Sequence, residues 1–524
     1  MKKILQYIGL LVFIIQFLAC SKSSFNINND NPNSPGTMDI NFVLGPCLKN
    51  IAELQNTGTT VRGNEDYSLE YWAGYWTIGG GYITNASIYN FTFDNTYLNG
   101  IWNGYWGILS NLQYVNNNAN GNNFYRGIVK ALNVVCYHNL VDMYGNIPYS
   151  QALQPDKYPQ AVYDNAADIY NDLFKQLDSA RILIKNGSGE APAAAYDIMY
   201  NASASKWISF INTLQLRILL RVSNLSAKPS YFQTALTNLN SSITNGDGFI
   251  NSAGNEAAVN PGYYNLAGKA NPMFATFWNI TQNLQSSNYI YYRANAAAVN
   301  FYLDGNIDWR VQRIYAPYDN NGDTKGGYFG VPTANNDTLS GLGQQDGGNG
   351  AYNETNGIGI LKSYAQATPL LPASESYFLQ AEAAYKGMIG GDYHALYQSG
   401  VEQSFIYAYS GSPSYWVNND ITDADTYISQ TTGKVNNYNV SLTTNPVETI
   451  ISQKWIALNG INPLEAYSEY RRTGFPSYIY GSKYAGAPQL PNRLYYPRSE
   501  YATNAGNVKA QGPDLLTNKI FWAR

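Results

Sequence analysis

The stretch "SKWISFINTLQLRILLRVSN", residues Ser205–Asn224, carries a helical pattern from one end to the other. Its apolar side chains recur every three or four positions, at Trp207, Ile211, Leu214, Ile218 and Val222. That spacing places them on one stripe of an α-helix, and a serine stands where an N-cap is needed. We therefore predict a helix whose stripe is buried, with Arg217 and Arg221 anchoring neighbouring carbonyls or carboxylates rather than ligand.

Further helices are predicted on both sides of this stretch. Two long amphipathic segments precede it, at Phe124–Gly145 and Val162–Ile184. Two adjacent pairs follow it, at Ala373–Met388 with Tyr393–Tyr409 and at Val447–Gly460 with Pro463–Pro476. Paired amphipathic helices of this size are similar to tetratricopeptide hairpins, although no strict 34-residue consensus repeats. The expected fold is mostly α, a scaffold of tetratricopeptide-like helical hairpins.

Two segments break the helical pattern. Glycine, asparagine and tyrosine dominate from about residue 246 to 365, where short β-prone pieces such as "NYIYYR" occur. A second segment of this kind, 410–440, follows Tyr409. Long loops in a compact chain usually carry function. We expect long loops and a few short strands over one face of the scaffold, within a single domain spanning 41–524 whose loop-rich insert is about 246–365.

The N-terminus has the pattern of an exported, anchored protein. Lys2 and Lys3 precede an apolar run from Ile4 to Ala19, which has the length of a secretory signal rather than of a membrane span. Cys20 follows directly, in the position of the acylated cysteine in a bacterial lipobox, and opens onto a polar stretch. The sequence thus predicts a signal peptide at 1–19 and a lipidated tether at 20–40. The alternative is an ordinary cleaved signal with an incidental cysteine.

The remaining composition limits the classes of function. The chain has 524 residues, a net charge of −4 and no basic run, so a nucleic-acid partner is not expected. Only Cys47 and Cys136 remain besides Cys20, which excludes a disulfide scaffold. One bridge between them is conceivable, but the apolar run around Cys136 favours a buried thiol. The 47 tyrosines and 10 tryptophans suit either a neutral, hydroxyl-rich ligand or a large protein contact.

None of the candidate motifs for catalysis or cofactor binding in the sequence is complete. The two histidines, His138 and His394, are predicted to be ordinary helix residues, and the serines of "SASK" are explained by helix capping. Neither "GLGQQDGG" nor "GYYNLAGKA" completes a nucleotide-binding loop. The loop Asp319–Asp323 begins like a calcium site but lacks the closing glutamate, so a turn is favoured and a weak ion site stays open. We predict no cofactor, no dedicated metal site and no enzymatic activity.

Six stretches together resemble the SusD/RagB family of outer-membrane nutrient-binding lipoproteins, in its SusD-like branch. They are "FNINNDNPNSPG", "LVDMYGNIPYSQAL", "KWISFINTLQLRILLRVS", "LLPASESYFLQAEAAYKGM", "KWIALNGINPLEAYSEYRRTGFP" and "LPNRLYYPRSEYATN", running from Phe25 to Asn504. Two features depart from the family pattern. Trp309 stands where an Asp-Pro-Arg motif usually has proline, and no acidic cluster follows Cys20, which leaves the membrane leaflet of the anchor open.

The resemblance implies a non-catalytic lipoprotein, anchored at the outer membrane and exposed on the cell surface. It also implies a partner, a SusC-like TonB-dependent transporter that the lipoprotein covers as a lid. The usual ligand of the family is an oligosaccharide taken up in polysaccharide utilisation, although some relatives take peptides. Four hypotheses stay open: an oligosaccharide binder, a binder of peptide or another nutrient, a glycoside hydrolase, and a structural lid whose aromatic side chains face the transporter.

The candidate ligand site combines an early aromatic segment with the loop-rich insert. In "EYWAGYWTIGGGYITN", residues Glu70–Asn85, a helix would set Trp72 and Trp76 side by side as i,i+4 neighbours, with Tyr82 and Asn85 following. The family places a binding tryptophan in this early region. The second wall would come from rings in the insert, at Trp278, Trp309 and Tyr328. The alternative for Trp72 and Trp76 is that both lie in the core.

Overall fold

The computed structural model describes most of the chain after the N-terminal segment. The described residues are 38–57, 67–79, 86–282, 284–305, 308–316, 323–331, 339–342, 344–345, 357–411, 417–479, 481–484 and 489–524. The predicted signal peptide, Cys20, Tyr82 and Asn85 lie outside them, as does the calcium-like loop apart from Asp323. None of the helices in the described part is long and apolar enough to cross a membrane.

The central predicted helix is confirmed as α9, Ala204–Val222. The Ser203 hydroxyl caps it by accepting a hydrogen bond from the Lys206 backbone amide at 3.5 Å. Every side chain of the predicted stripe is buried. The apolar periodicity therefore located both the helix and the face that it buries.

The other long helices confirm the predominantly α fold. They are α3 (Asn41–Thr57), α6 (Asn99–Asn118), α7 (Asn123–Tyr144), α8 (Ala166–Asn186), α10 (Phe232–Thr244), α15 (Ala373–Tyr385), α16 (Tyr393–Tyr409), α18 (Asp420–Ile428), α19 (Pro446–Ala457) and α20 (Pro463–Thr473). Each predicted helical segment overlaps one of them, with ends that differ by a few residues. Gly145, the last residue of the predicted segment Phe124–Gly145, ends α7 with a φ of 80° that favours glycine.

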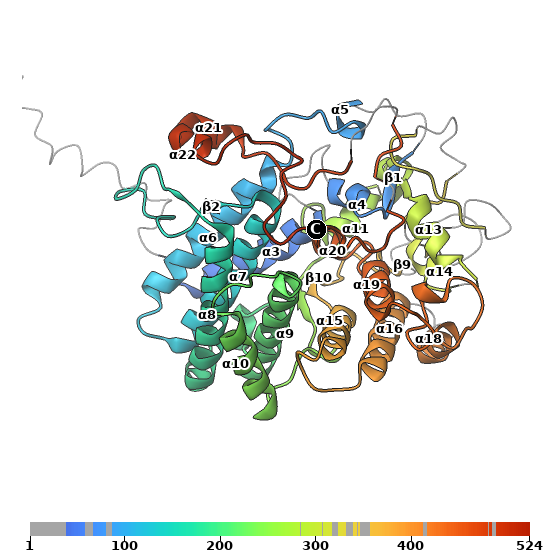
Figure 1. Ribbon diagram of the computed structural model, residues 1–524, viewed down its shortest axis with the longest axis horizontal. Helices are drawn as coiled ribbons and strands as arrows, with labels where there is room; N and C mark the ends of the chain where they lie inside the picture. Colours follow the sequence, from blue (N-terminus) through green and yellow to red (C-terminus); the bar gives the residue numbers. More distant parts are fainter. Residues whose placement is uncertain are drawn as a thin grey trace, which may run out of the picture.

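Consecutive helices pack side by side in a curved row (Figure 1). The contacts run from α3 to α6, then through α7, α8 and α9, and from α9 to α15, which contacts both α16 and α19. In Figure 1 the blue-to-green helices form the left half and the orange helices the right, with α9 and α15 between them. The row is the expected arrangement of stacked helical hairpins.

Shorter elements connect and cover the row. The short α-helices are α4 (Ser68–Trp72), α5 (Ala86–Tyr89), α11 (Pro272–Phe277), α12 (Asn288–Tyr291), α13 (Ala296–Tyr302), α14 (Val311–Ile314), α21 (Arg498–Thr503) and α22 (Ala505–Lys509). The described residues also include 3₁₀ turns at Ser188–Glu190, Ala194–Tyr196 and Val435–Asn437. The strands are β1 (Trp76–Ile78), β2 (Ile147–Pro148), β3 (Tyr163–Asp164), β4 (Ala257–Val259), β5 (Trp278–Asn279), β6 (Leu284–Gln285), β7 (Tyr292–Ala294), β8 (Gln344–Gln345), β9 (Gly357–Ile358) and β10 (Thr368–Leu371).

The strands pair only in twos among the described residues, always antiparallel. The pairs are β1 with β7, β2 with β3, β4 with β10, β5 with β6 and β8 with β9. The pair β1–β7 joins the early aromatic segment to the loop-rich insert, with Trp76 opposite Ala294. The insert is thus tied to the rest of the chain by short ladders rather than by a continuous sheet.

Two local predictions were wrong. The β-prone piece "NYIYYR" begins as the helical turn α12 and becomes strand only at Tyr292. The segment after Tyr409, predicted as a loop, contains α18, because Ala424 and Tyr427 lie on one face and bury together while Asp420 and Asp423 occupy the favourable first turn.

A buried network of charged side chains surrounds α9. The Arg221 guanidinium contacts Glu465 and Glu469 of α20 and lies 3.2 Å from the Asp142 carboxylate on α7. One turn earlier on α9, Arg217 lies 2.6 Å from the Glu375 carboxylate of α15. The expectation that these two arginines anchor carboxylates is confirmed. Four helices distant in sequence meet at this network.

Within the described part of the chain, no group of three or more His, Cys, Asp or Glu side chains could hold a metal ion. The side chains of His138, Cys47 and Cys136 are all buried. His138 lies on α7, 3.3 Å from the Asp142 carboxylate one turn later, and burial lowers its pKa. Cys47 and Cys136 are both free and buried, and burial raises the pKa of the Cys47 thiol to about 12. The prediction of a buried thiol at position 136 is confirmed.

Candidate functional site

The predicted pairing of Trp72 with Trp76 is wrong. Helix α4 ends at Trp72, and a turn through Gly74, whose φ is 77°, leads into strand β1 at Trp76. Both side chains are 0% exposed. Trp72 packs on Phe93 and Tyr467, and Trp76 packs on Tyr67 and Phe277. These two rings belong to the core and present no face to a ligand.

The other predicted rings divide between core and surface. Trp278, at the start of β5, is buried. Trp309 is 38% exposed and Tyr328 is 40% exposed, so both remain accessible. The residues on either side of Trp309, Asp308 and Arg310, form a buried ion pair. A ligand contact at Trp309 or Tyr328 stays a prediction.

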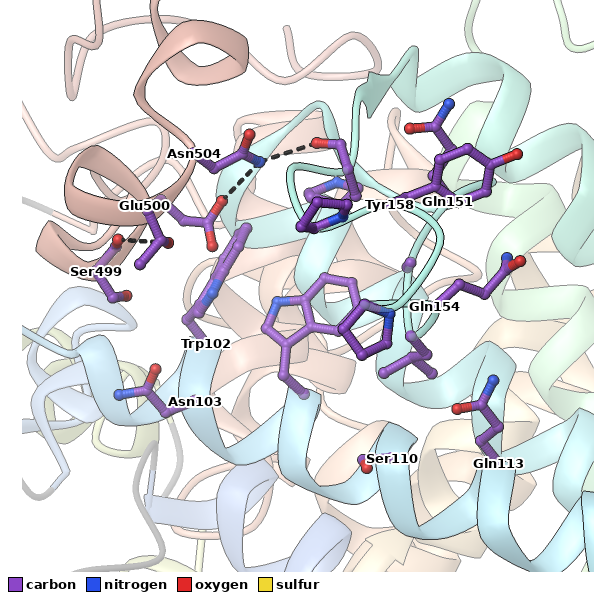
Figure 2. Close-up of a pocket in the computed structure, with 18 residues that line it drawn as sticks. Trp102, Asn103, Ser110, Gln113, Gln151, Gln154, Tyr158, Ser499, Glu500 and Asn504 are labelled. Atoms are coloured by element: carbon purple, nitrogen blue, oxygen red, sulfur yellow. Dashed lines mark hydrogen bonds between the residues drawn. The ribbon is translucent and has the colours of Figure 1, made fainter. Parts of the chain in front are cut away.

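A different set of residues forms an open cleft of about 640 Å³. The cleft lies between α6, the loop 148–161 and α21 (Figure 2). It is lined by aromatic rings, prolines, amides and hydroxyls: Trp102, Asn103, Trp106, Ser110, Gln113, Pro148, Gln151, Ala152, Leu153, Gln154, Pro155, Tyr158, Pro159, Ala161, Ser499, Glu500, Thr503 and Asn504. Its volume falls within the range of small-molecule binding sites.

Helix α6 supplies the floor of the cleft. Trp102, Trp106, Ser110 and Gln113 follow one another at spacings of four, four and three residues, which places them along one face of the helix. On the far side of the helix, Ile101, Ile108 and Val115 are buried in the core. The amphipathic character of α6 therefore fixes the direction in which the cleft residues point.

The loop 148–161 forms one wall and is held at its base. The pair β2–β3 joins its two ends, and the Asp164 carboxylate accepts hydrogen bonds from the backbone amides of Tyr149 and Ser150, both at 2.9 Å. The Gln151 side chain accepts a further bond from the Val162 amide at 3.2 Å. Leu153, which lines the cleft, has a φ of 60°, an unfavourable conformation of the kind that concentrates at functional sites.

Two tryptophans are braced by tyrosines behind them. The ring centroids of Trp102 and Trp106 lie 5.7 Å apart with planes inclined at 58°. Trp102 packs edge-on against Tyr144, and Trp106 packs edge-on against Tyr137. Trp102 is almost entirely buried, whereas Trp106 is half-buried and offers more of its ring to the cleft. The Trp106 Nε1–H makes no hydrogen bond to any residue in the described part of the chain.

On the opposite wall, Glu500 of α21 is the one acidic side chain among the described residues that line the cleft. Its Oε2 accepts hydrogen bonds from the Tyr163 hydroxyl at 2.8 Å and from the Asn504 side-chain amide at 3.3 Å. Burial raises the pKa of Tyr163, and the neighbouring Glu500 charge raises it further. Figure 2 shows Glu500 and Asn504 beside the Trp102 ring, across the cleft from Gln113 and Gln154. The lining thus combines flat apolar rings with side chains that can form hydrogen bonds.

A smaller cavity of about 260 Å³ lies between the pair β4–β10 and the end of α16. Lys362 and Glu256 line it. The Lys362 ammonium donates to the Tyr407 carbonyl at 2.9 Å, one of the carbonyls that the end of α16 leaves without a helical partner. Burial lowers the pKa of Lys362 to about 8 against the opposing effect of Glu256. This lysine serves as a helix cap.

The sequence contained signals for the larger cleft. "IWNGYW" at 101–106 repeats the tryptophan spacing of "YWAGYW" at 71–76 and lies within an amphipathic helix. Two stretches that carried the family resemblance also supply its walls. "LVDMYGNIPYSQAL" contains Pro148 to Leu153, and "LPNRLYYPRSEYATN" contains Ser499 to Asn504.

Comparison with known proteins identifies the family. A family model named SusD-like and described as starch-binding and associating with the outer membrane matches residues 32–497. The chain belongs to the SusD-like family. No protein with a curated description matches it. The SusD-like motifs found in the sequence thus reflect membership of the family over most of the chain.

Solved structures agree with this assignment. A chitin-binding SusD homologue from Flavobacterium johnsoniae is 22% identical, with a TM-score of 0.70 over 92% of this chain and 98% of that chain. A SusD homologue from Bacteroides fragilis is 20% identical, with a TM-score of 0.70 over 93% and 99%. A SusD-like protein from Bacteroides thetaiotaomicron is 22% identical, with a TM-score of 0.66 over 91% and 99%. At these identities the likeness establishes the shared SusD-like fold.

Proposed function

We propose that this SusD-like protein binds oligosaccharide in the cleft between α6, the loop 148–161 and α21. The observation that carries the proposal is the half-buried Trp106 ring among amide side chains in a cleft of about 640 Å³. A sugar ring has an apolar C–H face that stacks on an aromatic ring and hydroxyl groups that pair with amides. Trp106 and Tyr158 provide the faces, and Gln113, Gln151 and Gln154 provide the amides.

We further propose that binding takes place at the outer membrane, beside a transporter. The protein does not transform its ligand but delivers it to a SusC-like TonB-dependent transporter in the outer membrane. The family description, starch-binding and associating with the outer membrane, supports this role. A peptide ligand is the competing occupant, and the uncharged lining, apart from Glu500, favours glycan over charged peptide.

Replacing Trp106 by alanine is expected to weaken oligosaccharide binding about five- to tenfold, the equivalent of one aromatic contact of roughly 1 kcal/mol. Affinity is measured by calorimetry or affinity electrophoresis with neutral glucans and chitin oligomers, together with the melting temperature. Trp309→Ala is the comparison variant, because Trp309 is an accessible tryptophan outside the cleft and represents the competing ligand site in the loop-rich insert; under the present proposal it should bind as the wild type does. A folded Trp106→Ala protein that binds as tightly as wild type, with binding lost in Trp309→Ala, would move the site to the loop-rich insert.

We also propose that Cys20 is acylated and anchors the protein at the cell surface. The Cys20→Ala variant is expected to keep its leader or to appear as a soluble periplasmic form, because no thiol remains for the lipid. Fractionation and labelling with radioactive palmitate test this, with Cys47→Ala as a control that removes a buried thiol. Palmitate label and outer-membrane fractionation in the Cys20→Ala protein would contradict the anchor.

A further inference from the structure

The charged groups that line the cleft are of one sign, negative. Among the described residues that line it, Glu500 is acidic and none is basic. The remaining lining consists of neutral rings, amides, hydroxyls and aliphatic groups. Two exposed basic residues neighbour lining residues in sequence, Arg498 beside Ser499 and Lys157 beside Tyr158. The Lys157 ammonium lies 4.8 Å from the Tyr158 ring centroid. Its charge is matched on the same loop by Asp156.

The Glu500 carboxylate is held in place before any ligand arrives. The Tyr163 hydroxyl donates to its Oε2, and the Asn504 amide that reaches the same oxygen also donates to the Ala161 carbonyl at 2.9 Å. These donors are neutral, so they orient the carboxylate without cancelling its charge. A fixed acceptor of this kind makes strong hydrogen bonds to hydroxyl or ammonium groups, and it repels a second anion.

We propose that Glu500 sets the charge selectivity of the cleft. The site accepts neutral and amine-bearing oligosaccharides and rejects those that carry carboxylate or sulfate groups. This inference rests on the proposed function and adds the ligand class and the residue that determines it. The net charge of −4 on the whole chain acts in the same direction over longer distances.

The test uses an array that carries neutral, amine-bearing, uronate-bearing and sulfated glycans of several linkages. The wild-type protein is expected to retain neutral and amine-bearing glycans and to bind acidic ones at least about tenfold more weakly. Glu500→Gln keeps the shape and an acceptor for Tyr163 but removes the charge. Its preference for neutral over acidic glycans is expected to fall to about threefold or less, and it should lose affinity for amine-bearing glycans.

Asp156→Asn is the matched control, because it removes one negative charge from the exposed part of the same loop without changing the cleft lining. It should bind the array as the wild type does. The inference is overturned if the wild type binds neutral glycans through Trp106 yet binds acidic glycans equally well, or if Asp156→Asn and Glu500→Gln shift the pattern alike. If no glycan of any charge binds, the proposed function fails, and the inference fails with it.

Discussion

Replacing Arg221 by methionine should lower the free energy of unfolding by roughly 3–5 kcal/mol, the usual cost of removing one partner from a buried ionic network. The Arg221 side chain is fully buried and contacts Glu465, Glu469 and Asp142. Methionine fills much of the volume but leaves these carboxylates with less compensating charge. The guanidinium also lies 5.1 Å from the Trp522 ring centroid, so packing against the C-terminal segment is lost as well.

Urea unfolding followed by tryptophan fluorescence measures this loss. Arg126→Met is the matched control, because Arg126 is exposed on α7 and its removal should change the free energy of unfolding by less than about 0.5 kcal/mol. Equal stabilities for the two variants would mean that the network does not hold the helices together.

The pH dependence gives the same prediction a second readout. Burial would raise the pKa of Glu465, but Arg221, Lys454 and Arg217 outweigh it and lower the pKa from 4.5 to about 2. A depressed folded-state pKa contributes stability that is complete above the unfolded value and is lost as the pH falls through the folded value. The difference in stability between wild type and Arg221→Met should therefore narrow between pH 4.5 and 2.

The helical scaffold could be predicted because its signal is local. In α9 the apolar stripe, the serine cap and the charged groups at the far end all lie within about five turns of sequence. The sequence predicted that Arg217 and Arg221 contact carbonyls or carboxylates, but it did not indicate which residues supply them. They come from α7, α15 and α20, and no pattern within α9 identifies them.

The ligand site could not be located from local sequence patterns, because two segments with the same tryptophan spacing adopt different backbone structures. "YWAGYW" and "IWNGYW" share their spacing, and a glycine stands between the tryptophans in each. Gly74 takes a φ of 77° and breaks the helix. Gly104 stays helical, and a Cβ there would lie 2.7 Å from Leu54 of α3. Glycine permits both a turn and a close helix contact, and only the tertiary structure decides between them.

The different conformations at Gly74 and Gly104 also explain why Trp76 is buried and Trp106 borders the cleft. The turn at Gly74 directs Trp76 into strand β1, against the loop-rich insert, where its ring is covered by Phe277 and Tyr292. The continuous helix α6 instead keeps Trp106 on the face that borders the cleft. Burial of an aromatic side chain depends on contacts distant in sequence, which composition and spacing do not contain.

Leu214→Ala should destabilise the protein by about 2–5 kcal/mol through lost burial and the cavity left behind. Leu214 lies at the middle of the α9 stripe and is 0% exposed. The large aromatic and aliphatic residues next to it on the stripe, Trp207, Ile211 and Ile218, are equally buried, so little of the cavity can be filled by rearrangement.

The matched control is Leu515→Ala, which removes the same atoms from a side chain that is 49% exposed and should cost less than about 1 kcal/mol. Both variants are compared with wild type by urea unfolding and by melting temperature. An unchanged unfolding curve for Leu214→Ala would contradict the burial of the stripe. A loss shared equally by Leu515→Ala would show that the cost arises from the removed atoms and not from their place in α9.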